Sequence, residues 1–148
     1  MSEKSKKSES YVIIILKILM IVFTVVWSFF IVVMTGAGLV YNYQSYGQKI
    51  MQTGVFFIIS GILMTSGTVL SLFRKKILNL ISVILSCTGF ILCMIMLYRL
   101  VNHADRNGWT DNFTLMPVSD MYRTRIMPVI VPSALSVITA VRNYLSDK

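Results

Sequence analysis

The side chains best suited to chemistry gather in one polar stretch, residues 99 to 125. It contains one histidine, three aspartates and four arginines: His103, Asp105, Asp111, Asp120, Arg99, Arg106, Arg123 and Arg125. Imidazole and carboxylate groups could act as general acid and base, for example on a lipid headgroup. Several arginines together could instead hold a phosphate, because a guanidinium binds its oxygens through two parallel hydrogen bonds.

Neither a metal site nor a catalytic motif is strongly indicated within this stretch. One histidine with scattered aspartates lacks the close ligand spacing of zinc sites. His103 could transfer protons with Asp105 or Asp111, but no nucleophile elbow or phosphate-binding loop accompanies such a pair. We therefore expect a protein without enzyme activity, metal or cofactor.

Helix-end electrostatics accounts for most of the same residues without any ligand. Arg99, His103 and Arg106 would face the negative end of a helix dipole. Asp120 is expected to cap the N-terminus of the next helix, and the other aspartates to neutralise nearby arginines. If a ligand does bind, the candidate contacts for an anion or lipid headgroup are Arg99, Arg106, Arg123 and Arg125.

Two aromatic residues and a modification pattern complete the stretch. Trp109 and Phe113 are expected to fold back over the helix ends or to enter the headgroup layer. Asn112-Phe113-Thr114 matches the acceptor pattern for N-glycosylation, which arises often by chance and depends on the host.

The rest of the chain is dominated by apolar blocks. Of 148 residues, 55% are hydrophobic and only 14% are charged, against about a quarter charged in soluble domains. Each block is about long enough to cross a bilayer as a helix, which takes about 20 residues. A strand barrel would show short alternating segments instead. The sequence predicts an all-α polytopic membrane protein, a four-helix transmembrane bundle.

The expected elements follow the blocks. Residues 1–10 are predicted to be a disordered cytoplasmic tail, 11–145 a single transmembrane domain and 146–148 a short tail. The spans are expected at about 12–40, 50–73, 77–98 and 124–144, with an outer loop over 99–123. Helical character should continue past the third span and stop near Asn107-Gly108, and Pro128 should start or kink the fourth. Gly36-Ala37-Gly38 could end a signal peptide, but the apolar run before it is too long, so we expect a retained helix.

Basic residues set the expected orientation. The net charge is +8, and because these charges lie at block ends, lipid headgroups explain them better than nucleic acid does. With the N-terminus inside, nine basic residues lie on the inner side and five on the outer side. This split favours cytoplasmic N- and C-termini in a plasma-membrane protein.

Small residues recur along the predicted helices at close to helical spacing. They are Thr53, Gly54, Ser60, Gly61 and Gly67 in the second block, and Ser82, Ser86, Gly89 and Cys93 in the third. Small side chains let backbones approach closely, which drives helix association in lipid. These faces could pack only the bundle of one chain, or they could also contact a second copy or a partner.

Functional expectations follow from this picture. No Asp, Glu, His or Arg is expected at mid-span, which argues against a proton- or sodium-coupled carrier. We expect a small non-enzymatic membrane protein, acting as an accessory or self-associating subunit of a membrane assembly. The partners are then the lipid bilayer and a homo-oligomer or membrane protein. The alternatives are a passive pore or lipid-handling transporter lined by hydroxyl groups, and a membrane enzyme that uses the 99–125 stretch.

Overall fold

The computed structural model describes residues 3–73, 75–109 and 117–146, which are helical apart from short turns. The elements are α1 (Glu3–Val25), the π-helical segment η1 (Val26–Val33), α2 (Met34–Tyr41), α3 (Tyr43–Tyr46), α4 (Gln48–Leu70), α5 (Lys76–Arg106), α6 (Val118–Ile126), the 3-10 turn η2 (Met127–Val129) and α7 (Ile130–Ser146). We call α1–η1–α2 the first helix and α6–η2–α7 the fourth helix, because each is continuous.

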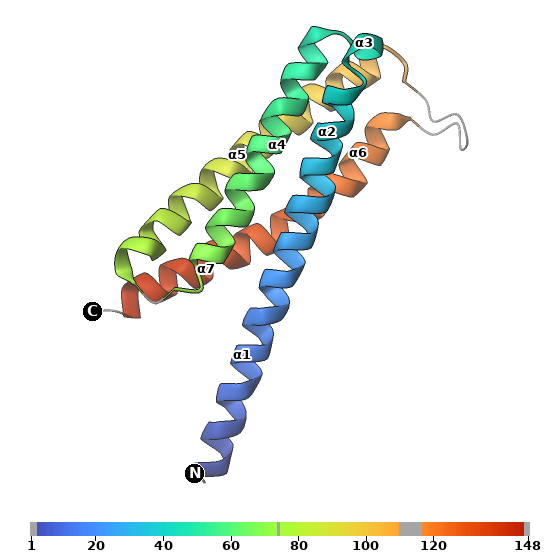
Figure 1. Cartoon of the computed structure of the whole chain (residues 1–148). Coiled ribbons are helices and arrows are strands. Elements are labelled where there is room, and N and C mark those ends of the chain that lie inside the picture. The colour runs from blue at the N-terminus through green and yellow to red at the C-terminus, as the bar shows by residue number, and fades with distance from the viewer. Residues whose placement is uncertain (1–2, 74, 110–116, 147–148) are drawn as a thin grey trace.

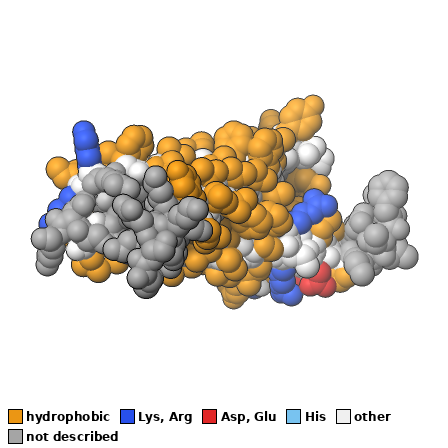
Figure 2. All heavy atoms as spheres, turned by 90° about the horizontal axis from the view of Figure 1, so that it is seen from below, with side chains coloured by type: hydrophobic (Ala, Val, Ile, Leu, Met, Phe, Trp, Pro, Cys, Tyr) orange, Lys and Arg blue, Asp and Glu red, His pale blue; other side chains and the backbone are white. Residues whose placement is uncertain are grey.

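Four helices are long and apolar enough to cross a membrane: Ile14–Tyr41, Gln48–Leu70, Lys76–Arg106 and Val118–Leu145. The prediction of an all-helical chain with four such helices is therefore confirmed for the described ranges. On the face shown in Figure 2, apolar side chains cover the middle of the molecule, and Lys and Arg side chains lie toward both ends.

The helices form an elongated bundle (Figure 1). α4 and α5 make an antiparallel hairpin with the most extensive contact in the molecule, the first helix packs along α4, and α7 packs on α5. Both chain ends lie toward the lower end in Figure 1, while α3, the end of α5 and the start of α6 lie toward the upper end. The core between the helices includes Val32, Phe57, Met64, Leu100 and Ile126.

Two predicted boundaries are corrected by the structure. The tail expected over residues 1–10 is helical from Glu3 onward, because Glu and Lys are good helix formers and can extend a helix that the apolar block already nucleates. The start of the fourth span, expected at about 124, is also corrected, because α6 already begins at Val118. At the other end of the 99–123 stretch α5 continues to Arg106, as predicted, and residues 110–116 lie outside the described residues.

The ends of the helices at the upper end of the bundle depend on glycine. α5 stops at Arg106, Asn107 follows, and Gly108 has φ +59°, so the predicted stop at Asn107-Gly108 is confirmed. Gly47 has φ +88° and separates α3 from α4. Both residues occupy the left-handed region, which residues with a Cβ rarely adopt.

The fourth helix bends at Pro128, as predicted. Proline lacks an N–H group and clashes with the preceding turn of an α-helix, and the structure has the 3-10 turn η2 at this point. Asp120, however, is not the N-cap: the capping position is Pro117, and Asp120 lies within the first turn. The helix begins earlier than its polar sequence suggested because Ser119 and Ile126 are buried against the bundle.

Candidate functional site

The polar end of the bundle, at the top of Figure 1, is assembled from α3, α4, α5 and the start of the fourth helix. Gly108 turns the chain back, so that the backbone N–H of Trp109 donates to the Ala104 carbonyl at 3.0 Å. The indole then packs on Tyr46, with ring centroids 4.8 Å apart, and edge-on against His103 at 5.2 Å. Trp109 thus covers the helix end, as predicted. Phe113 and Asn112 lie outside the described residues.

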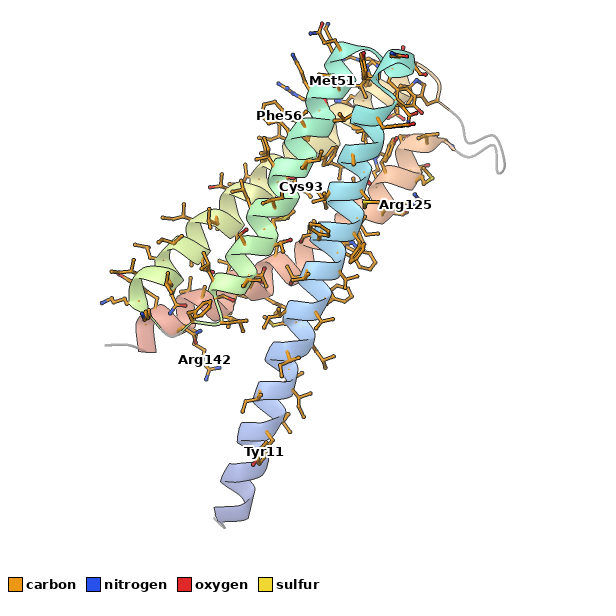
Figure 3. All side chains as sticks on the ribbon, viewed as in Figure 1. Tyr11, Met51, Phe56, Cys93, Arg125 and Arg142 are labelled. Atoms are coloured by element: carbon orange, nitrogen blue, oxygen red, sulfur yellow. The ribbon has the colours of Figure 1, made fainter. Side chains whose placement is uncertain are left out.

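The structure does not gather the four predicted arginines into one site. Arg123 lies 3.7 Å from the Asp105 carboxylate and 3.3 Å from that of Asp120. The Arg125 carbonyl accepts a hydrogen bond from the Trp27 indole at 3.0 Å, and Figure 3 shows Arg125 lower in the view than Met51. Arg106 is the exposed last residue of α5.

Arg99 instead lines a pocket between the start of α4 and the end of α5. The pocket has a volume of about 320 Å³ and is lined by Lys49, Ile50, Gln52, Thr53, Arg99 and His103. Arg99 and His103 are four residues apart, which places both on one face of α5. Sequence reasoning missed the α4 contribution, because Lys49 stood alone in a short polar turn and only the pairing of α4 with α5 brings it to Arg99.

The structure separates the proposed proton-transfer residues. His103 and Asp105 are two positions apart on α5, about 200° around the helix. Accordingly the Asp105 carboxylate pairs with Arg123, whereas His103 lines the pocket and contacts Trp109. Within the described ranges, no group of three or more His, Cys, Asp or Glu residues is placed to hold a metal ion. Asp111 lies outside those ranges.

The nine small residues of the predicted packing faces are all buried within one chain. On α4, Gly54 approaches Gly36 of the first helix so closely that a Cβ on either residue would lie within 2.7 Å of the other's carbonyl oxygen. Gly61 faces Ser28 and Val33 of the same helix. α4 therefore uses its Gly54–Gly61 row to contact the first helix.

The opposite row of α4 contacts α5. Gly67 lies directly against Ser82 and Ser86, and the Ser82 hydroxyl donates to the Gly67 carbonyl at 2.6 Å. Gly89 of α5 packs in turn on Leu63 and Met64. Ser60 lies beside the buried Cys93 thiol. Thr53 donates to its own helix, at the Lys49 carbonyl. The hydroxyl groups of Thr53, Ser60 and Ser82 thus lie within the helix contacts of one chain.

Some buried polar groups at the lower end tie the helices together. The hydroxyls of Thr68 and Ser136 lie 3.2 Å apart, and the Asn143 amide donates to the Ser71 carbonyl at 3.2 Å. Asn79 is different: it is fully buried, and neither its amide nitrogen nor its oxygen has a hydrogen-bond partner in the described part of the chain. Such a group destabilises the fold unless something satisfies it.

No protein-family model, curated protein or solved structure shows a significant match to this chain.

Proposed function

We propose that this chain is a non-enzymatic four-span membrane protein that associates with a second copy of itself through the first helix. The observation that supports this proposal is that the rest of the chain covers little of the first helix. In its most apolar window 17% of the residues are buried, against 44% for α4. Exposed Tyr11 lies on the lower part of α1, which extends away from the other helices in Figure 3.

The uncovered part extends beyond the rest of the bundle. Gly54 lies opposite Gly36, and Gly61 lies opposite Ser28. The two helices run antiparallel and rise equally, by about 1.5 Å per residue, so Leu70 at the end of α4 lies at about the level of residue 20 of the first helix. The apolar residues before that level have no neighbour from α4. The span Ile14–Tyr41 has 28 residues, or about 42 Å, which exceeds the hydrocarbon thickness of about 30 Å. Such a mismatch favours tilting or helix association, but Lys76–Arg106 and Val118–Leu145 are also long, with 31 and 28 residues, so what distinguishes the first helix is its low burial.

A second copy is the occupant that fits this helix. In a second copy the same uncovered stretch lies at the same depth, so two parallel first helices around a two-fold axis would cover each other there. The exposed side chains of α1 also include a run at alternating spacings of three and four residues, Val12, Ile15, Leu19 and Val22, which ends before the π-helical segment η1 begins at Val26. This is the a/d spacing of a left-handed helix pair.

Membrane insertion, the plasma membrane and cytoplasmic termini belong to the same proposal. The charge split of nine to five supports that orientation, and the position of both chain ends toward one end of the bundle is consistent with it.

Disulfide crosslinking in lipid tests the self-association. In a background with Cys87→Ser and Cys93→Ala, Leu19→Cys lies on the proposed contact and Ile14→Cys lies well away from it on the same helix. Both native side chains are exposed, by 59% and 49%. We expect oxidation to give a covalent dimer for Leu19→Cys and little for Ile14→Cys, at high lipid-to-protein ratio. Equal dimer yields would reject the parallel pair, and crosslinking of either variant only to a different protein would reject self-association.

A further inference from the structure

We propose that the pocket lined by Lys49, Arg99 and His103 binds the phosphate group of an anionic membrane lipid. This inference rests on the membrane insertion proposed above, but not on pairing of the first helix. The pocket volume of about 320 Å³ corresponds to about ten water molecules at about 30 Å³ each. It therefore has room for a phosphate together with part of a headgroup.

The charge of the pocket is positive and uncompensated within the described structure. Lys49 and Arg99 both line it, and no carboxylate does. Among the described residues, Asp105 and Asp120 both form their ion pairs with Arg123. These two carboxylates therefore compensate Arg123 and not the cations of the pocket. Two cations facing one pocket repel each other, and an anion between them converts that repulsion into attraction.

The position of Lys49 strengthens the case. Lys49 is the second residue of α4, where the positive end of the helix dipole disfavours a cation. Of the first N–H groups of that helix, those of Ile50 and Met51 donate to the Gly47 carbonyl, so those of Gln48 and Lys49 are the ones left for an outside acceptor. A phosphate oxygen near Lys49 would offset both unfavourable features, because helix N-termini favour negative charge.

Three polar side chains of the pocket, Arg99, Lys49 and Gln52, can each contact a phosphodiester. The Arg99 guanidinium can hold two phosphate oxygens at once, and the Lys49 ammonium supplies a compact charge. Gln52 adds an amide donor at the same wall. His103 is held in place from its other side, because the Trp109 indole packs edge-on against the imidazole and is itself supported by Tyr46.

The surroundings favour a lipid over a free anion. Ile50, which is 2% exposed, supplies an apolar wall to the pocket. Tyr98, next to Arg99, is 69% exposed, and Tyr46 and Trp109 lie on the same end of the bundle. Tyrosine and tryptophan collect at the depth of lipid headgroups. The pocket therefore lies where lipid phosphates are concentrated.

Lipid retention by the full-length protein tests the proposal. The protein is placed in nanodiscs of phosphatidylcholine with one-tenth phosphatidylglycerol, and bound phosphatidylglycerol is measured by native mass spectrometry after release. Arg99→Gln and Lys49→Gln remove pocket charges, while Arg106→Gln removes one charge of the same type from the same end of α5 outside the pocket. Far-ultraviolet circular dichroism confirms that each variant keeps its helices.

We expect each pocket variant to weaken phosphatidylglycerol retention by about tenfold, the effect of losing one charge-assisted hydrogen bond. Arg106→Gln should change it less than about twofold, since Arg106 is exposed like Lys49 and Arg99 but does not line the pocket. Equal losses for all three variants would indicate diffuse attraction to the surface and overturn the site. In a second arm, inorganic phosphate is titrated into the detergent-solubilised protein. Displacement of phosphatidylglycerol by inorganic phosphate at millimolar concentration would overturn the lipid assignment in favour of a soluble phosphate.

Discussion

The contact between the first helix and α4 can be tested by adding a single carbon atom. Gly36 and Gly38 both lie in α2, two residues apart. A Cβ on Gly36 would lie 2.5 Å from the Gly54 carbonyl oxygen and 2.9 Å from the Phe57 Cβ. A Cβ on Gly38 would meet nothing within 4 Å. Gly36→Ala and Gly38→Ala therefore form a matched pair that differs only in what the new methyl group contacts.

The expected magnitude follows from these distances. Ordinary contact of a Cβ begins near 3.4 Å, so the two helices must separate by about 1 Å to accept alanine at position 36. Forcing such an atom into a packed contact costs about 1–3 kcal/mol. Replacing glycine by alanine inside a helix also stabilises the helix itself, by up to about 1 kcal/mol. Because both variants share that gain, the difference between them should equal the packing cost of about 1–3 kcal/mol.

The free energy of unfolding can be measured by titrating SDS into mixed micelles and following the fluorescence of Trp27 and Trp109. Trp27 lies within the π-helical segment η1 and Trp109 lies at the polar end of the bundle, so the two probes report on different regions. We expect Gly36→Ala to unfold at lower SDS than Gly38→Ala. If the two variants unfold at the same SDS concentration, the Gly36–Gly54 contact is not part of the fold.

Two further changes probe single hydrogen bonds in the same assay. Trp27→Phe keeps an aromatic ring stacked on Phe23 but loses the bond to the Arg125 carbonyl, and should lower stability by about 1 kcal/mol; an unchanged midpoint would show that the bond contributes nothing. Asn79→Leu replaces a buried amide without a partner among the described residues, and should raise stability by about 1–3 kcal/mol. A clear loss of stability would instead mean that water or another group satisfies Asn79.

The four long helices were predictable because each apolar block is continuous and ends at charged or aromatic residues. The stop of α5 was also predictable, since Gly108 must adopt a positive φ and glycine is the residue that does so readily. The start of the fourth helix was not. Its first turns read as polar loop, and tertiary contacts such as the burial of Ile126 decide the outcome against local sequence preference.

The candidate site was less predictable than the fold, for geometric reasons. The four arginines are close in sequence, but the rotation of α5 directs Arg99 toward α4, and Arg123 is taken up by Asp105. Lys49 joins the pocket only because α4 and α5 are antiparallel neighbours. The sequence indicated Gly36 only as part of a possible cleavage site. Its close contact with α4 could not be predicted, because that contact depends on which residue of the neighbouring helix lies opposite.

The burial of the small residues limits which surfaces of this protein could contact a partner. Small-residue faces are the usual means of close helix association in lipid, and in this chain Gly54, Gly61, Gly67 and Gly89 are already in contact with neighbouring helices. A partner that approached through them would first have to separate the bundle. The surfaces left uncovered carry large side chains, such as Leu19 and Val22 on the first helix. The proposed self-association would therefore use broad packing of branched side chains, and the first helix, which its own chain covers least, offers the most of them.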